Sequence, residues 1–218
     1  MAVVLRKHDD LPGNYHSQRP DVFRYLPESA RMILDVGCGE GGFGELIKQG
    51  RDAEVWGVEL DPEVAEKAKK RLDRVFVGNI ETDRFDLPEE YFDCIVLNDV
   101  LEHLYYPWDV LERLKKYLKT DGHVIASIPN IRYYVNLKKF VLKGEWEYES
   151  SGVMDRTHIR FFTLKSMRKM FERCSYRDIR IEGLYYIALP WKLNLLNKLM
   201  GNRLDDIRYM QYLCLAKK

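Results

Sequence analysis

The sequence predicts an α/β protein built around a parallel β-sheet, and three observations support this. Short apolar segments alternate with amphipathic stretches through the first 130 residues, the order of strands and helices in such a sheet. A glycine-rich turn follows the first apolar segment, as in nucleotide-binding α/β proteins. The composition, 46% hydrophobic and 32% charged, is that of an ordinary folded protein.

The first 130 residues contain five expected strands and three expected helices. The strands are expected at residues 32–36, 54–59, 75–77, 94–97 and 123–127, and the helices at 42–49, 62–73 and 107–119. Pro62 and Pro107 fall in first turns, where proline is tolerated, and Asp61 is suited to cap the second helix. The Thr-Asp-Gly sequence at 120–122 predicts a turn before the fifth strand.

After residue 127 the alternation gives way to a basic, aromatic segment. We expect residues 131–162 to form a helical cap over the carboxyl ends of the strands. Thr163 is expected to N-cap a helix that reaches about residue 174. Two strands follow, at 179–188 and 209–216, and no change in composition divides residues 1–218 into more than one domain.

The segment between the last two strands, residues 190–202, has an apolar helical face. Trp191, Leu195 and Leu199 share that face, with lysines elsewhere. Packing against the last strands is the expected arrangement. Contact with a membrane surface or with a second copy of the chain, as in a homodimer, is the alternative.

Charge and cysteine content limit the classes of function. There are 35 basic and 34 acidic residues, which gives a net charge of +1 and no basic footprint for nucleic acid. Residues 1–130 carry a net charge of −8 and residues 131–218 one of +9, which favours an anionic ligand for the second part. No apolar run could span a membrane and no signal peptide is evident, so a cytoplasmic protein with four buried free thiols is expected.

The turn after the first strand predicts a nucleoside-binding loop. Gly37, Gly39 and Gly42 fit the dinucleotide pattern G-x-G-x-x-G, and Glu59 lies where a ribose-binding acid would follow. A plain strand–helix turn would also explain the glycines. Because Asp35 ends the strand and a second carboxylate stands inside the loop, a pyrophosphate is disfavoured there. A cationic, phosphate-free ligand such as S-adenosylmethionine fits better.

Residues 34–41, Leu-Asp-Val-Gly-Cys-Gly-Glu-Gly, resemble the first motif of the class I S-adenosylmethionine-dependent methyltransferases. The resemblance covers about residues 15–127 well and the rest of the chain less sharply. It implies a Rossmann-like, seven-stranded, mostly parallel sheet with an antiparallel C-terminal hairpin and helices on both faces. It also implies S-adenosylmethionine as the cofactor.

The resemblance assigns cofactor contacts at the ends of successive strands. Asp35, Gly37, Cys38 and Gly39 would surround the methionine part, Glu59 would accept the ribose hydroxyls, and Leu60 would pack on the adenine.

Further contacts follow from later motifs. Asn79 would accept from the adenine amino group, although the family often has aspartate there, and Ile80 would contact the ring through its backbone. Asn98 would face the cofactor from the fourth strand. Tyr15 or Arg19 would lie near the cofactor carboxylate. For each position alone, a polar group at a solvent-exposed strand end is the alternative.

Two histidines are candidates for chemistry on the acceptor. Transfer to a hydroxyl needs a base that removes its proton, and histidine has a suitable pKa. His158 lies in residues 155–163, Asp-Arg-Thr-His-Ile-Arg-Phe-Phe-Thr. This motif resembles one in bacterial methyltransferases of glycan and polysaccharide biosynthesis. His158 is the preferred base or acceptor ligand, and a structural role is the alternative. His103 is the second candidate, more typical of a packing residue.

The sequence therefore predicts an enzyme that methylates, most often at oxygen, a small or glycan-type acceptor such as a nucleotide-linked sugar. Basic and aromatic residues of the cap would suit an anionic sugar, or they could be the solvated and packed faces of one helix. A non-catalytic cofactor-binding module, a nicotinamide-dependent oxidoreductase and a nucleic-acid methyltransferase are the alternatives. No metal site is expected, because the cysteines lack metal-ligand spacing.

Overall fold

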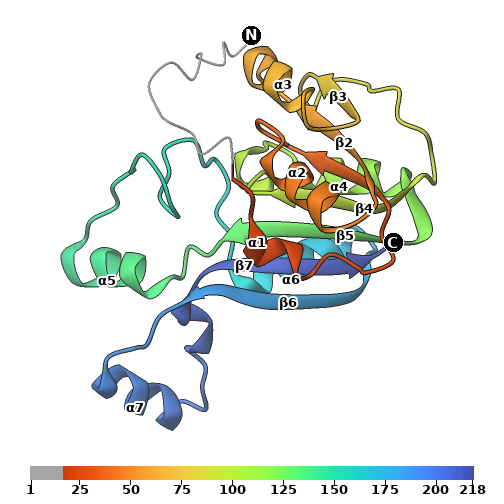
Figure 1. The fold of residues 1–218 in the computed structure, drawn as a ribbon. Coiled ribbons are helices and arrows are strands. Elements are labelled where there is room, and N and C mark those ends of the chain that lie inside the picture. Colours follow the sequence, from red (N-terminus) through yellow and green to blue (C-terminus); the bar gives the residue numbers. More distant parts are fainter. Residues whose placement is uncertain (1–16) are drawn as a thin grey trace.

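Residues 17–218 are described by a computed structural model, whose centre is a seven-stranded sheet in the order β3-β2-β1-β4-β5-β7-β6 (Figure 1). The strands are β1 (Met32–Val36), β2 (Glu54–Glu59), β3 (Arg74–Val77), β4 (Phe92–Asn98), β5 (Leu118–Pro129), β6 (Arg177–Tyr186) and β7 (Tyr209–Lys217). The first five strands pair in parallel, and β7 runs antiparallel to both β5 and β6. The predicted sheet is confirmed, including its antiparallel C-terminal pair.

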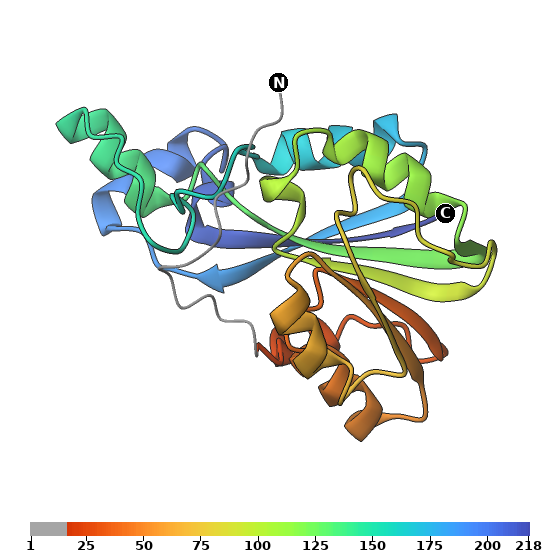
Figure 2. The same ribbon diagram turned by 90° about the horizontal axis from the view of Figure 1, so that it is seen from above.

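Helices cover both faces of this sheet. They are α1 (Pro20–Phe23), α2 (Gly42–Gly50), α3 (Pro62–Ala68), α4 (Pro107–Lys115), α5 (Tyr134–Lys143), α6 (Leu164–Arg173) and α7 (Trp191–Leu199), with 3-10 turns η1 (Leu101–His103) and η2 (Asp205–Arg208). Figure 2 shows α4 and α6 on one face and α1, α2 and α3 on the other, whereas α5 and α7 project beyond the sheet. The three-layer arrangement places the carboxyl ends of β1, β2 and β4 along one edge.

Each face of the sheet has its own apolar core. On one side Leu111 and Leu114 of α4 meet Met167 and Phe171 of α6 over the central strands. The cluster on the opposite face, beneath α1 and α2, includes Val22, Phe43 and Ile47. Removal of the apolar side chains of both clusters from water is the main contribution that stabilises the packing of the helices on the sheet.

The helix caps follow the sequence signals. Asp61 accepts hydrogen bonds from the backbone N–H groups of Glu63 and Val64, with Pro62 in the first turn of α3. Thr163 forms a reciprocal capping box with Ser166 at the start of α6. Both predicted caps are confirmed, because each side chain satisfies backbone donors that have no partner within their helix.

Several predicted boundaries differ from the structure. The helix expected at 107–119 ends at Lys115, and the strand expected at 123–127 begins already at Leu118. The strand expected at 179–188 spans Arg177–Tyr186.

The helix expected to reach residue 73 ends at Ala68, where the backbone tightens and the N–H of Arg71 donates to the carbonyl of Ala68. The turn expected at 120–122 lies within β5. The register between β4 and β5 shifts between the pairs Phe92–Leu118 and Cys94–His123, so residues 119–122 form an irregular part of the strand pairing.

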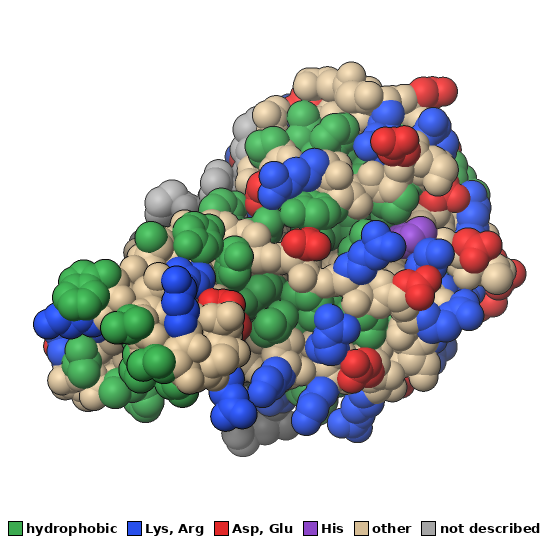
Figure 3. Space-filling model, turned by 90° about the horizontal axis from the view of Figure 1, so that it is seen from below, with side chains coloured by type: hydrophobic (Ala, Val, Ile, Leu, Met, Phe, Trp, Pro, Cys, Tyr) green, Lys and Arg blue, Asp and Glu red, His purple; other side chains and the backbone are tan. Residues whose placement is uncertain are grey.

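The projecting helices expose apolar side chains. Trp191 and Leu199 of α7 are 72% and 78% exposed, so the expected packing of this face against the last strands is wrong. Figure 3 shows hydrophobic side chains gathered on the projecting end of the molecule, with lysines and arginines among them. No helix within residues 17–218 is both long and apolar enough to cross a membrane.

Packing of α4 against the sheet should be measurable by truncation of Leu114, which is fully buried. Leu114→Ala is expected to lower the free energy of unfolding by about 2–5 kcal/mol in urea titrations, because it leaves a cavity that the core fills incompletely. The matched control is Leu142→Ala in α5, whose side chain is 73% exposed and should cost less than about 0.5 kcal/mol. Equal losses in the two variants would contradict this account of the core.

Candidate active site

The glycine loop between β1 and α2 is held against the end of β2. The backbone N–H groups of Gly37 and Cys38 both donate to the carbonyl of Val58, at 2.8 and 3.1 Å. Gly37 has φ of +72°, and a Cβ there would lie 2.6 Å from Cγ2 of Val100, which follows β4. A glycine is therefore required, and the loop fills the space between the ends of β2 and β4.

Glu59 is the residue that joins the two βα connections of this edge. Its Oε2 accepts a hydrogen bond from the N–H of Gly39 at 2.8 Å, and its Oε1 accepts one from the N–H of Asp61 at 3.0 Å. The side chain is buried. Because each carboxylate oxygen has two acceptor sites, Glu59 can still accept the two ribose hydroxyls assigned to it by the sequence.

Asp35 is a buried carboxyl group beside the same loop. It is 1% exposed, and its Oδ2 has no hydrogen-bond partner in the described structure. Burial, and then the charge of Glu59, raises the pKa of Asp35 to about 8. A positively charged ligand would relieve this cost, so the site fits an ammonium or sulfonium group and disfavours a phosphate.

The remaining predicted cofactor residues are at the same edge. Cys38 packs beside Gly57 of β2 and burial raises the pKa of its thiol, so it acts as an apolar filler. The side chain of Leu60 is about half exposed at the end of β2 and can take a ligand on its surface. Asn98, at the end of β4, has both polar side-chain atoms buried, without a hydrogen-bond partner in the part of the chain that the structure describes.

Asn79 and Ile80 form the turn after β3. The Oδ1 of Asn79 accepts from the N–H of Glu81 at 2.8 Å, so this side chain already shapes the turn. The carbonyl of the buried Ile80 accepts from the guanidinium of Arg113. The turn is thereby fixed by α4, and adenine contact at these two residues stays a prediction.

Arg19 is buried and paired with protein groups. Its guanidinium donates to the carboxylates of Asp99 and Asp21, to Oγ of Ser127 at 3.2 Å and to Oε1 of Gln211 at 3.3 Å. The two carboxylates neutralise its charge, so in this arrangement Arg19 fixes the end of β4 instead of offering a free cation. Its contact with a cofactor carboxylate stays a prediction, and Tyr15 lies outside the described residues.

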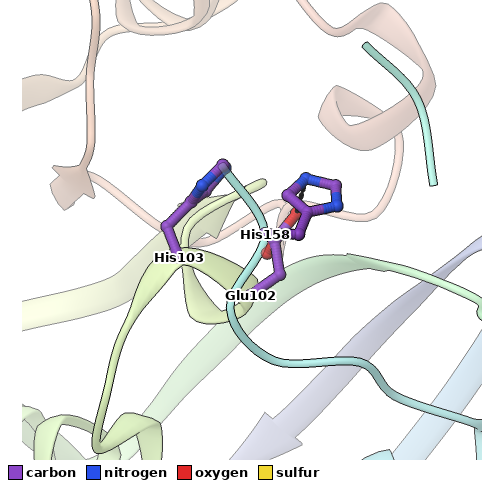
Figure 4. Close-up of side chains that lie close together, drawn as sticks. All are labelled: Glu102, His103 and His158. Atoms are coloured by element: carbon purple, nitrogen blue, oxygen red, sulfur yellow. Dashed lines mark ion pairs between the residues drawn. The ribbon is translucent and has the colours of Figure 1, made fainter. Parts of the chain in front are cut away.

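The two predicted histidines are brought together beyond β4. His103 and His158 have ring centroids 4.8 Å apart in an edge-to-face arrangement. His158 follows a turn capped by Asp155, and the N–H groups of the next two residues both donate to the carbonyl of Glu102 at 3.0 Å. Figure 4 shows Glu102 and His103, from η1, beside His158 from the cap loop.

Glu102 is a member of this cluster that sequence analysis missed. It is 1% exposed, both of its carboxylate oxygens lack hydrogen-bond partners within residues 17–218, and Nε2 of His158 lies 4.0 Å from Oε1. Burial raises the pKa of Glu102 well above its ordinary value. The available signal was a glutamate inside the apolar run from Val100 to Leu104.

The cap carries fewer available cations than its sequence suggests. Arg132 pairs with Asp206 at 3.2 Å, Lys139 with Glu149 at 2.6 Å, and the guanidinium of Arg160 donates to a backbone carbonyl. Between α5 and residues 145–154 lies a cavity of about 150 Å³. Its exposed surface is mostly apolar, with Leu137, Phe140, Trp146 and Met154 in its lining, and charged residues that include Arg132, Lys139 and Glu147 also line it.

Comparison with known proteins agrees with this geometry. Residues 13–180 match a protein family described as a methyltransferase domain. The chain is 29% identical over 206 residues to the ubiquinone biosynthesis O-methyltransferase of Aliivibrio fischeri (strain MJ11), covering 83% of this chain and 82% of the relative. It is 27% identical over 220 residues to the protein of the same name from Proteus mirabilis (strain HI4320), covering 92% and 84%.

Solved structures share the fold. A SAM-dependent methyltransferase from Archaeoglobus fulgidus superposes with a TM-score of 0.65, 22% identity and 91% coverage of each chain. Phosphoethanolamine N-methyltransferase 2 of Haemonchus contortus, solved with S-adenosyl-L-methionine, gives 0.61, 14% identity, and coverage of 90% of this chain and 51% of that one. At these identities the likeness establishes the fold of the chain.

The raised pKa of Asp35 predicts a pH-dependent stability. Because the folded-state pKa of about 8 lies above the ordinary value of 3.8, the folded protein holds a proton that the unfolded chain releases between these values. The contribution of Asp35 to stability is therefore lost as pH rises toward 8. Asp35→Asn should flatten the decline in unfolding free energy between pH 5 and pH 8, measured by urea titration.

Asp93→Asn is the matched control for that measurement. Burial alone would raise the pKa of Asp93, but its hydrogen bonds with Lys119 and two backbone N–H groups lower it overall, so this group is ionised in both states above pH 5. Its removal should shift stability without changing the slope. An unchanged slope in Asp35→Asn would contradict the assignment.

Proposed function

We propose that this chain, which belongs to the methyltransferase domain family, transfers a methyl group to an oxygen atom of a small-molecule acceptor. The chain is an S-adenosylmethionine-dependent methyltransferase, and this family membership decides against the nicotinamide-dependent alternative. The observation that carries the proposal is the pair of buried carboxyl groups, Asp35 and Glu59, on either side of the glycine loop. Transfer to oxygen is supported by the names of the curated relatives, which are O-methyltransferases.

The residues of the glycine-loop edge fit the cofactor. When bound, S-adenosylmethionine supplies an electrophilic methyl group on a cationic sulfur. Asp35, whose Oδ2 has no partner, would bind the cationic methionine part, and Glu59 would accept the ribose hydroxyls with its remaining acceptor sites. The amide of Asn98 offers a donor and an acceptor from the end of β4.

His158 is the proposed base or acceptor ligand. Its Nδ1 lies 3.1 Å from the carbonyl of Val153, and since a carbonyl can only accept, this contact places the ring proton on Nδ1. Nε2 then has the lone pair that can take a proton from an acceptor hydroxyl. His103 packs against the ring of His158 and is the second candidate for this role.

The acceptor that the cap favours is small and partly apolar. Three features support this: the mostly apolar cavity, the pairing of Arg132 and Lys139 with acidic residues, and relatives named for ubiquinone biosynthesis. The glycan-type acceptor and the anionic sugar predicted from the sequence have no support from these relatives. A phenolic or other apolar hydroxyl compound is therefore the acceptor class that we propose.

A direct assay tests the proposal. The purified chain, incubated with methyl-labelled S-adenosylmethionine, should transfer label to a member of a panel of phenolic hydroxyl compounds and not to sugar nucleotides or to amine analogues of the same shape. Mass spectrometry of the product would locate the methyl group on oxygen. Label on nitrogen alone, or transfer to sugar nucleotides alone, would refute the proposed acceptor class.

Replacement of His158 should separate chemistry from cofactor binding. His158→Ala is expected to lower kcat by about 10²–10⁴-fold, because the hydroxyl proton loses its acceptor, with unchanged affinity for S-adenosylhomocysteine by calorimetry. His123→Gln, in β5 and away from this cluster, is the control and should keep full turnover. Near-normal turnover in His158→Ala would rule out the assigned role.

A further inference from the structure

We propose that Glu102, His103 and His158 form a binding site for one divalent first-row transition-metal ion, at the acceptor side of the active site. Within the described residues, these three side chains each offer a ligand atom, and the three atoms lie within 4.8 Å of one another. Figure 4 shows the side chains next to one another at the end of β4. Sequence analysis named His103 and His158 but predicted no metal site, because η1 and the cap loop are far apart along the chain.

The geometry is close to that of a metal site. Metal bonds to histidine nitrogen and carboxylate oxygen are about 2.0–2.2 Å long, so neighbouring ligand atoms stand about 3–4 Å apart. Nε2 of His158 and Oε1 of Glu102 are already 4.0 Å apart, too far for a hydrogen bond and suited to two ligands of one ion. Small rotations of the side chains would bring the third ligand atom within reach.

The burial of Glu102 supports the metal site independently of the distances between the ligand atoms. Its carboxyl group is 1% exposed, and neither oxygen has a hydrogen-bond partner among the described residues, although buried polar atoms in folded proteins are nearly always satisfied. A dication would bind these oxygens and compensate the charge of the carboxylate.

Both imidazole rings are oriented as metal ligands usually are. Nδ1 of His158 lies 3.1 Å from the carbonyl of Val153, and Nδ1 of His103 lies 3.2 Å from the carbonyl of Thr157. Contacts of this kind fix the tautomer and the direction of a ligating ring. Val153 and Thr157 both precede His158 in the same cap loop, so folding of the cap would assemble the site.

The ligand chemistry selects the class of ion. Two imidazoles and one carboxylate suit Zn²⁺, Mn²⁺ or Co²⁺ better than Ca²⁺ or Mg²⁺, which prefer oxygen ligands. Three protein ligands leave a position for a further oxygen atom, as in catalytic metal sites. On the proposed function, that position would be taken by the acceptor oxygen, whose pKa the ion would lower so that its proton passes to solvent. Because Nε2 of His158 would bind the ion, His158 would then act as a ligand and not as the base.

The test measures metal binding in the full-length chain, without methyl donor or acceptor. Chelator-treated protein is titrated with Zn²⁺, Mn²⁺ or Co²⁺ alone by calorimetry, with the metal content per chain determined by mass spectrometry. The visible absorption of bound Co²⁺ reports its coordination. We expect one ion per chain, and affinity weakened at least about ten-fold in Glu102→Gln and in His158→Ala.

His123→Gln is the matched histidine control and should bind the ion as the unmodified chain does. If Glu102→Gln or His158→Ala fails to fold, as judged by circular dichroism, His103→Ala replaces it, because His103 is the least buried of the three. Absence of saturable binding by all three ions, or equal affinity in the ligand variants and the unmodified chain, would overturn the metal site.

The outcome is separable from that of the proposed function. Stoichiometric ion binding that depends on Glu102 and His158 supports the metal site even if no phenolic acceptor is methylated. Methyl transfer by protein that binds none of the three ions would overturn the metal site and leave His158 as the base.

Discussion

The carboxylate of Glu59 is the interaction on which the arrangement of the cofactor edge depends. It accepts one N–H from the glycine loop and one from the start of α3, so the connections that follow β1 and β2 are held at a fixed separation. Gly37 lies in the first of these connections, and Asp35 lies at the end of β1 just before it. A loop with several positive-φ glycines has little rigidity of its own, and the hydrogen bonds to the buried Glu59 carboxylate hold it in place.

Buried carboxyl groups are costly, and this protein places several of them along one edge. Asp35 and Glu102 both have pKa values raised by burial, and both have oxygens without hydrogen-bond partners. The cations near this edge are paired with protein carboxylates, as Arg19 is with Asp99 and Asp21. A cationic ligand would therefore stabilise the ionised form of the buried carboxyl groups at this edge.

The two sides of the site are linked through β4 and η1. Val100 closes over Gly37 on the cofactor side, and two residues later Glu102 supports the cap loop through its carbonyl. A movement of the cap would therefore displace η1, which lies next to the glycine loop. The apolar faces of α5 and α7 extend from the same end of the sheet and remain exposed in the described chain.

The sequence by itself determined the sheet, the caps of α3 and α6, and the glycine-rich turn after β1, because strand periodicity, capping residues and the glycine–carboxylate pattern are local signals. Tertiary structure decided what depends on distant segments. It placed residues 120–122 within β5, left Trp191 exposed, and paired Arg19 with Asp99. It also brought Glu102 to His158, a proximity set by how the cap loop folds back on η1, which no local pattern of residues encodes.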